Sequence, residues 1–264
     1  MISPTERMIA EIDGAIGWMV FNNPARRNAI SVDMWAAIPT ILDHFESDPR
    51  VRVVVLKGAG DKAFISGADI SQFEQQRSSP ETVKQYDEVA ERAMTRLQAT
   101  RFPTIAMIHG FCIGGGVGTA LCCDLRIAAE NARFAVPAAR LGLGYRWGGV
   151  KKLVEIVGPS FAKEIFFTAR QFSAAEALAM GLVNRVLPEA ELEAYVRNYC
   201  ALMAENAPLT MEAVKGVIAE LNKPGAEIDR ARCEALVARC FASVDYIEGR
   251  RAFMEKRKPV FRGK

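Results

Sequence analysis

The sequence lacks the paired cysteines and histidines of a structural zinc site. It has two histidines, and its six cysteines show no C-x-x-C spacing. Most of the cysteines stand among apolar residues; they are Cys112, Cys122, Cys123, Cys200, Cys233 and Cys240. We therefore expect reduced thiols in the core of a cytoplasmic protein, and no metal site.

Signals for export or membrane insertion are also missing. Residues 1–4 show no basic segment followed by an apolar one, and no apolar run is long enough to cross a bilayer. These absences predict a soluble, cytoplasmic protein that has no membrane partner.

A strong excess of charge of one sign is absent as well. The 34 lysines and arginines nearly balance the 31 aspartates and glutamates, which leaves a net charge of +3. No stripe of interleaved basic and aromatic residues occurs, so we expect no nucleic-acid partner. The short basic run at 256–258 is still enough to hold the phosphates of a small molecule.

The chain has 264 residues, half of them hydrophobic, which suits one large core with or without a small appended domain. Strand and helix patterns alternate in its first third, and this alternation implies parallel strands joined by crossover helices. The predicted elements are a hairpin of residues 8–12 and 16–21 around Asp13-Gly14, a helix at 32–45 with Ser31 as N-cap, a strand at 51–56, a helix at about 80–97 and a strand at 104–108.

The second half is mainly helical. Ser173 and Glu176 have capping-box spacing and begin a helix that ends near Gly181, and a strand at 183–187 follows. Further helices are predicted at 189–205, 208–221, 225–242 and 245–256. We therefore predict an α/β domain at 1–195 and a helical domain at 196–264.

Two glycine-containing segments carry the chemical signal. Residues 113–121 follow a predicted strand and begin a predicted helix, so unpaired backbone N–H groups converge there and favour negative charge. The Rossmann pattern and the P-loop lysine are both missing. The second segment, at 64–70, follows the buried strand. Taken alone, each segment is better explained as a tight turn that closes a strand–helix unit.

Several weak motifs occur together in one order. They are Asn28-Ala29-Ile30, residues 64–70, His109-Gly110-Phe111 with the glycine triplet, residues 124–128, Phe134, Leu141-Gly142, Gly148-Gly149, residues 168–170, residues 177–183 and the tail at 248–261. This set resembles the crotonase (enoyl-CoA hydratase/isomerase) superfamily over essentially the whole chain. The combination is far more specific than any single motif.

The resemblance implies an α/β protein with a crotonase-like ββα spiral core and a C-terminal helical trimerisation region. It also implies a lyase or isomerase that acts at the α-carbon of an acyl-CoA thioester. Coenzyme A would then enter as part of the substrate, with no tightly bound cofactor. The expected assembly is a homotrimer or a dimer of trimers.

The resemblance also assigns site residues. The backbone N–H groups of Ala68 and Gly115 would bind the thioester oxygen, as an oxyanion hole does. The positions expected to hold coenzyme A are Arg26, Arg27, Ala29, Ser66, Ala68, Asp69, Ile70, Phe253 and Lys256. The last two match tail positions that often reach the cofactor of a neighbouring subunit.

The sequence departs from the hydratase pattern at two positions. Hydratases of this superfamily use two glutamates, and Gly118 and Ala138 stand in their places. Neither residue can carry a proton, so hydration would need other side chains. Decarboxylation of a malonyl-type thioester needs the oxyanion hole but no base, because loss of carbon dioxide generates the enolate directly.

The segment 141–145 resembles the methylmalonyl-CoA decarboxylases of the superfamily, as do residues 163–169 and 245–249. Tyr145 would then orient a carboxylate or protonate the enolate, and Arg146 or Arg140 would neutralise a substrate carboxylate. That subgroup has histidine in place of Ala68 and glutamate in place of Gly118.

Other interpretations stay open. Hydration is possible if Asp69, Glu74 or Tyr145 positions the water, and thioester hydrolysis or a catalytically silent acyl-CoA-binding homologue fits the same motifs. Several candidates also have a structural interpretation: Asp69 as the N-cap of a helix starting at Ile70, Arg146 as an ion-pair partner, and His109 as a hydrogen-bonding residue of the core.

Overall fold

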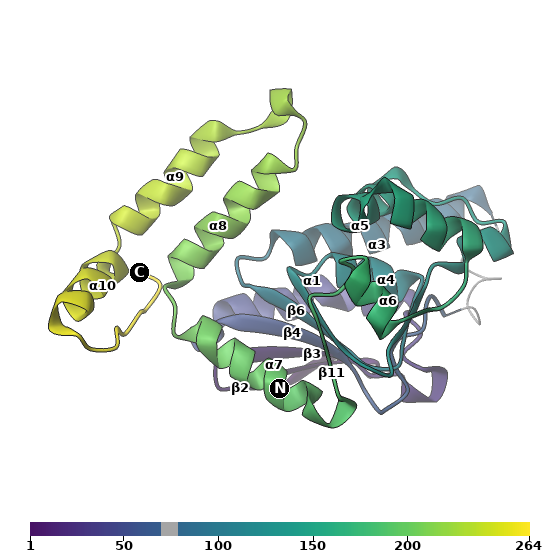
Figure 1. Ribbon diagram of the computed structural model, residues 1–264, viewed down its shortest axis with the longest axis horizontal. Helices are drawn as coiled ribbons and strands as arrows, with labels where there is room; N and C mark the ends of the chain where they lie inside the picture. The colour runs from purple at the N-terminus through teal and green to yellow at the C-terminus, as the bar shows by residue number, and fades with distance from the viewer. Residues whose placement is uncertain (70–78) are drawn as a thin grey trace. The chain divides into compact units, whose positions relative to one another are not determined.

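The computed structural model describes residues 1–69 and 79–264. The chain forms two compact units, one of Met1–Thr100 with Thr104–Val196 and the other of Arg101–Pro103 with Arg197–Lys264 (Figure 1). All the strands of the described residues belong to the first unit, and the second unit is helical.

The larger sheet has seven strands in the order β1-β2-β3-β4-β6-β8-β11. They are β1 (Ile2–Thr5), β2 (Met8–Asp13), β3 (Ile16–Phe21), β4 (Val53–Gly58), β6 (Thr104–Ile108), β8 (Leu125–Ala129) and β11 (Arg185–Leu187). The strands β1 to β3 are antiparallel, whereas β3 to β11 pair in parallel. The predicted hairpin and the predicted parallel strands are confirmed.

The smaller sheet positions the two glycine-containing segments. Its order is β10-β9-β7-β5, and β5, β7 and β9 pair in parallel while β10 is antiparallel to β9. The strands are β5 (Ala63–Ile65), β7 (Phe111–Ile113), β9 (Arg133–Ala135) and β10 (Phe172–Ser173). Because β5 and β7 are parallel neighbours and directly precede the two segments, both segments leave the same edge of this sheet.

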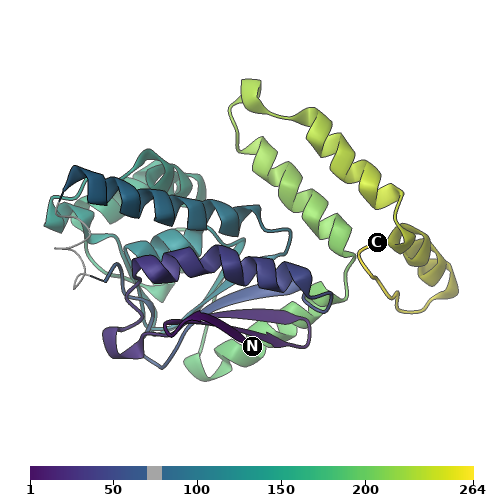
Figure 2. The ribbon, with the colours of Figure 1, turned by 180° about the vertical axis from the view of Figure 1, so that it is seen from behind.

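Helices α1 (Val32–Ser47) and α3 (Pro80–Ala99) pack side by side, and α1 also contacts β1, β2 and β3 (Figure 2). The apolar face predicted for α1 is buried. Ser31 stands at the N-cap position, but its hydroxyl bonds to the carboxylate of Asp33 at 2.5 Å and caps no backbone amide. The predicted N-cap position is therefore confirmed, although the Ser31 side chain bonds to a carboxylate and not to a backbone amide.

The remaining helices of the first unit include one that the sequence analysis did not predict. The helices are α4 (Gly115–Leu121), α5 (Trp147–Thr168), α6 (Ala174–Ala179) and α7 (Glu189–Ala204), which continues into the second unit. The capping box of α6 is confirmed, with Ser173 and Glu176 each bonding to the other's backbone amide. The unpredicted helix α5 is interrupted at Gly158, where φ is +75°, directly before Pro159.

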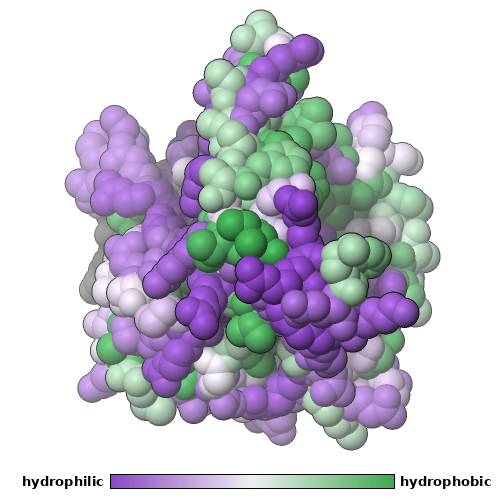
Figure 3. Space-filling view, turned by 90° about the vertical axis from the view of Figure 1, so that its left-hand side faces the viewer, coloured by the Kyte–Doolittle hydropathy of each residue, from purple (hydrophilic) through white to green (hydrophobic). Residues whose placement is uncertain are grey.

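The second unit contains α8 (Pro208–Leu221), α9 (Arg230–Phe241) and α10 (Val244–Glu255). The single helix predicted at 225–242 is wrong: a short 3-10 turn at Gly225–Glu227 precedes α9, whose N-cap is the side chain of Asp229. Apolar side chains of these helices gather on the face shown in Figure 3 and line a cavity of about 940 Å³ within the unit. No helix among the described residues is both long and apolar enough to span a bilayer.

Candidate active site

The two glycine-containing segments lie against each other beyond the ends of β5 and β7. Gly67 and Gly114 both have positive φ, +120° and +53°. A Cβ placed on Gly114 would lie 4.0 Å from the Cα of Gly67, and a Cβ on Gly67 would lie 3.6 Å from the carbonyl oxygen of Ile113. These positions favour glycine because L side chains rarely adopt this backbone conformation.

The backbone N–H of Ala68 is not used in the pairing of its segment with Ile30. Ala68 forms a parallel bridge with Ile30, whose amide donates to the carbonyl of Gly67 at 2.8 Å and whose carbonyl accepts from the amide of Asp69 at 2.9 Å. Because alternate residues of an extended chain direct their backbone groups to opposite sides, the N–H of Ala68 faces away from Ile30.

Gly115 brings a second backbone N–H to the same place. It is the first residue of α4, so its amide has no partner within the helix. A Cβ built on Gly115 would lie 4.0 Å from the nitrogen of Ala68 and 3.8 Å from the buried indole of Trp35. Residues 68 and 115 are therefore close to each other in the structure.

An ion pair flanks the Ala68 segment. Arg26 Nη1 lies 2.9 Å from Asp69 Oδ1, and the side chain of Asp69 is only 4% exposed. The Ser66 hydroxyl donates to the carbonyl of Arg26 at 3.3 Å, and the guanidinium of Arg27 lies 5.1 Å from the ring centroid of Phe111. Arg26 thus contacts two other predicted coenzyme A positions, Asp69 through its side chain and Ser66 through its carbonyl.

The other predicted coenzyme A positions are distributed differently. Ala29 is buried directly before Ile30. Phe253 and Lys256 belong to the second unit, where Phe253 is 83% exposed on α10 and Lys256 ends that helix with a φ of +53°. Ile70, and with it the helix that Asp69 was predicted to cap, lies outside the described residues, as does Glu74.

A cavity of about 580 Å³ lies between α3, α4 and α5. Gly118 lines it, and a Cβ there would have Met94 Sδ as its nearest neighbour, at 3.9 Å. Gly118 follows Gly115 by three residues on α4, so both are on the same face of that helix. Ala138 is buried in the 3-10 helix Pro137–Leu141. The two positions that hold glutamate in hydratases thus offer no titratable group here.

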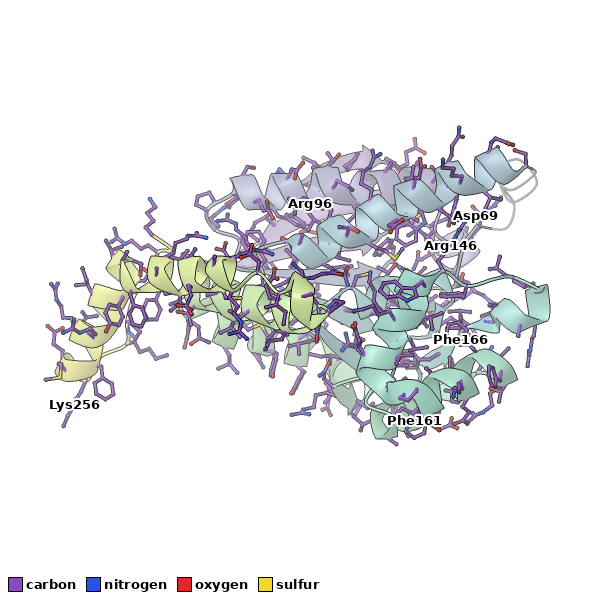
Figure 4. All side chains as sticks on the ribbon, turned by 90° about the horizontal axis from the view of Figure 1, so that it is seen from above. Asp69, Arg96, Arg146, Phe161, Phe166 and Lys256 are labelled. Carbon is purple, nitrogen blue, oxygen red and sulfur yellow. The ribbon has the colours of Figure 1, made fainter. Side chains whose placement is uncertain are left out.

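Tyr145 and Arg146 line this cavity, and Arg146 is the N-cap residue of α5. The ring of Tyr145 packs edge-on against Phe166 with centroids 4.8 Å apart, and burial raises the pKa of its hydroxyl to about 12. The hydroxyl therefore stays protonated at neutral pH. Arg146 Nε donates to Asp87 Oδ2 at 2.9 Å; Figure 4 shows Arg146 at the start of α5 and Phe166 near its end.

Sequence reasoning missed several charged residues of the cavity. Asp87 and Glu91 of α3 line it, together with Lys152 of α5. The signal was present in part, because residues 84, 87, 91 and 94 have the spacing of one helical face. Nothing in the sequence indicates that this face of α3 is opposite α4 and α5.

His109 is a core residue outside the lining of this cavity. Its Nε2 is buried without a hydrogen-bond partner among the described residues, and burial lowers its pKa. A neutral imidazole that points into the protein is consistent with the structural interpretation. No group of histidine, cysteine, aspartate and glutamate in the described residues is arranged to hold a metal ion.

Known proteins are similar in sequence to this protein over nearly its full length. The family model for enoyl-CoA hydratase/isomerase matches residues 11–264. The chain is 34% identical to the crotonyl-CoA hydratase of Syntrophomonas wolfei over 260 residues, which cover 97% of this chain and 98% of that protein. It is 32% identical to the carnitinyl-CoA dehydratase of Escherichia coli K12 over 256 residues, 96% of this chain and 97% of the other.

A solved structure gives the same result. The crystal structure of an enoyl-CoA hydratase/carnithine racemase from Magnetospirillum magneticum matches with a TM-score of 0.94 and 35% identity, over 98% of this chain and 97% of that one. The predicted crotonase-like α/β fold is confirmed, and so is the prediction of an enzyme. This similarity over nearly the full chain shows that the protein belongs to the enoyl-CoA hydratase/isomerase family of the crotonase superfamily.

Proposed function

We propose that this enzyme binds an acyl-CoA thioester and stabilises its enolate with the backbone N–H groups of Ala68 and Gly115. The observation that carries the proposal is the proximity of these donors, since a Cβ on Gly115 would lie 4.0 Å from the Ala68 nitrogen. A thioester oxygen placed between them would accept two hydrogen bonds. Each bond strengthens as negative charge develops on the oxygen, and one such donor typically contributes about 100- to 1000-fold in rate.

The reaction that we favour forms the enolate without a protein base. In decarboxylation of a malonyl-type thioester, the bond from the α-carbon to the carboxylate breaks and its electron pair forms the enolate while carbon dioxide leaves. Tyr145 is the proposed proton donor to the α-carbon, because this residue lines the cavity and its hydroxyl remains protonated at neutral pH. Water would then return the proton to the phenolate. The absence of a titratable group at Gly118 and Ala138 supports this choice.

Hydration is the second candidate. It is favoured by relatives such as the crotonyl-CoA hydratase of Syntrophomonas wolfei and by the carboxylates of Asp87 and Glu91 on the cavity wall. Asp69 is a weaker candidate for positioning water, because it is buried against Arg26. Hydration through α3 would need Asp87 to leave Arg146 or Glu91 to reach the substrate.

The coenzyme A moiety is proposed to bind along the segment that includes Ser66, with Arg26 and Arg27 close to its phosphates. Both arginines are near that segment, because the Ser66 hydroxyl donates to the carbonyl of Arg26 and the Ser66 amide donates to the carbonyl of Arg27 at 3.1 Å. Arginine forms charge-assisted hydrogen bonds with phosphate. Phe253 and Lys256 would contribute from the second unit, in this subunit or in a neighbouring one of a trimer.

A mass-spectrometric screen of the purified protein tests these alternatives. The substrates are crotonyl-CoA, methylmalonyl-CoA, ethylmalonyl-CoA and several aromatic CoA thioesters. A mass loss equal to carbon dioxide is expected for a malonyl-type substrate. A gain equal to one water on crotonyl-CoA would establish hydration, and release of free coenzyme A would establish hydrolysis. Stabilisation by these ligands with no turnover would identify a silent binder and contradict the proposed catalysis.

A further inference from the structure

Some of the charged residues that line the cavity form ion pairs with other described residues, and some do not. They are Lys84, Asp87, Glu88, Glu91, Arg146 and Lys152. Arg146 is paired with Asp87, and Lys84 lies 3.9 Å from Glu88. Glu91 is exposed to solvent on α3. Lys152 is half-buried, and its ammonium has no carboxylate partner within the described part of the chain.

The ammonium of Lys152 lies beside the turn of α4 that contains Gly118. Its Nζ is 3.5 Å from Cys122 Sγ, and that thiol donates to the carbonyl of Gly118 at 3.2 Å. Burial raises the pKa of Cys122, so the thiol stays neutral and does not balance the charge of the lysine. A cation therefore stands close to a position where hydratases of the superfamily have a glutamate.

The lining of the cavity is partly apolar. Met94, Val117, Leu121, Leu153 and Phe166 line it together with Lys152. No carboxylate of the described residues supplies this half-buried lysine with an opposite charge. A carboxylate brought by the ligand would supply that charge and form a charge-assisted hydrogen bond.

We infer that this cavity accepts an acyl group with a free carboxylate at the end remote from the thioester, and that Lys152 pairs with that carboxylate. The inference rests on the proposed function, because the thioester end must lie at the amides of Ala68 and Gly115. Gly115 and Gly118 share one face of α4, so the cavity begins one helical turn from the first donor.

Binding of matched thioesters by the whole protein tests the inference. Succinyl-, glutaryl- and adipyl-CoA are compared with butyryl-, valeryl- and hexanoyl-CoA by isothermal titration calorimetry. The variant is Lys152→Met, which keeps an unbranched side chain and removes the charge. The control is Lys151→Met, because Lys151 pairs with Glu155 and does not line the cavity. Circular dichroism confirms that both variants are folded.

The wild-type protein is expected to bind at least one carboxylated thioester about 10- to 100-fold more tightly than its neutral counterpart. Lys152→Met should remove this preference and leave the affinity for the neutral thioester unchanged, and Lys151→Met should keep it. Equal binding of both kinds by the wild type, or a preference that survives in Lys152→Met, would overturn the inference and leave the proposed function standing. Failure to bind any thioester would overturn the proposed function as well.

Discussion

Two neighbouring positions of α4 have opposite surroundings. At Gly116 an added Cβ would lie 2.2 Å from the carbonyl oxygen of Ile65, whereas at Gly118 its nearest neighbour would be Met94 Sδ at 3.9 Å. The first position belongs to the tightly packed backbone that presents the two amides, and the second faces a cavity bounded by side chains. We conclude that substitutions in the backbone around the amide pair are poorly tolerated. Substitutions around the cavity can instead alter which acyl group it accepts and which side chains act as acid or base.

The largest expected effect comes from removing one amide. Gly115→Pro deletes the N–H at the first position of a helix, where proline is well tolerated. We expect kcat/KM to fall by about 100- to 1000-fold on whichever thioester the enzyme converts.

Gly115→Ala is the matched control, since it keeps the N–H and places its Cβ 3.4 Å from Ile30 Cγ2. It should retain most of the activity. A folded proline variant with wild-type kcat/KM would show that this amide is not a catalytic donor.

The space beside Gly118 is tested by a substitution that should increase activity. Gly118→Glu places a carboxylate where there is room for it, so the protein should fold and its crotonyl-CoA hydration should rise by about 100-fold. Gly118→Gln has the same shape without a titratable group, and it should show no such rise. Equal rates for both variants would mean that position 118 lies outside the reacting centre.

Substitutions at Gly116 and Gly118 should also differ in their effect on the free energy of unfolding. Gly116→Ala should lower the free energy of unfolding by about 2–3 kcal/mol, because the backbone of Ile65 must move. Gly118→Ala should leave it unchanged or raise it by up to about 1 kcal/mol, since alanine favours a helix. Urea unfolding followed by circular dichroism measures both, and similar losses would refute the difference in packing.

The smallest expected effect concerns the pH dependence of stability. Burial raises the pKa of Tyr145 to about 12 in the folded protein, above the value of about 10 for an unfolded tyrosine. From about pH 10 the unfolded chain loses this proton first, so stability should fall as the pH rises toward 12, by about 2 kcal/mol from this residue. Tyr145→Phe should lack that part of the loss. Identical alkaline stability curves for both proteins would contradict a buried hydroxyl.

Local patterns were predicted well from the sequence. The hairpin around Asp13-Gly14 and the capping box of α6 depend on residues close together in the chain, and both are present. The helix predicted at 225–242 is split because the N-cap at Asp229 starts a new helix after Pro224 and Gly225. Ser31 occupies the predicted N-cap position, where its hydroxyl donates to the carboxylate of Asp33.

The candidate site was predicted in part, for a physical reason. The proximity of residues 68 and 115 followed from resemblance, and the parallel pairing of β5 with β7 explains it. The cavity needed tertiary information, since Asp87, Gly118 and Lys152 come from three helices that are far apart in the chain. Helical spacing identifies the face of each helix but not which faces meet.

The position of Trp35 has a practical consequence. Its indole is 2% exposed, donates to the hydroxyl of Tyr86 at 3.0 Å, and lies within 3.8 Å of a Cβ placed on Gly115. A thioester held at the two amides would change the polarity around this ring. In a Trp18→Phe/Trp147→Phe variant, which lacks the other two tryptophans, the fluorescence of Trp35 therefore provides an optical signal for occupancy of the site by a CoA thioester.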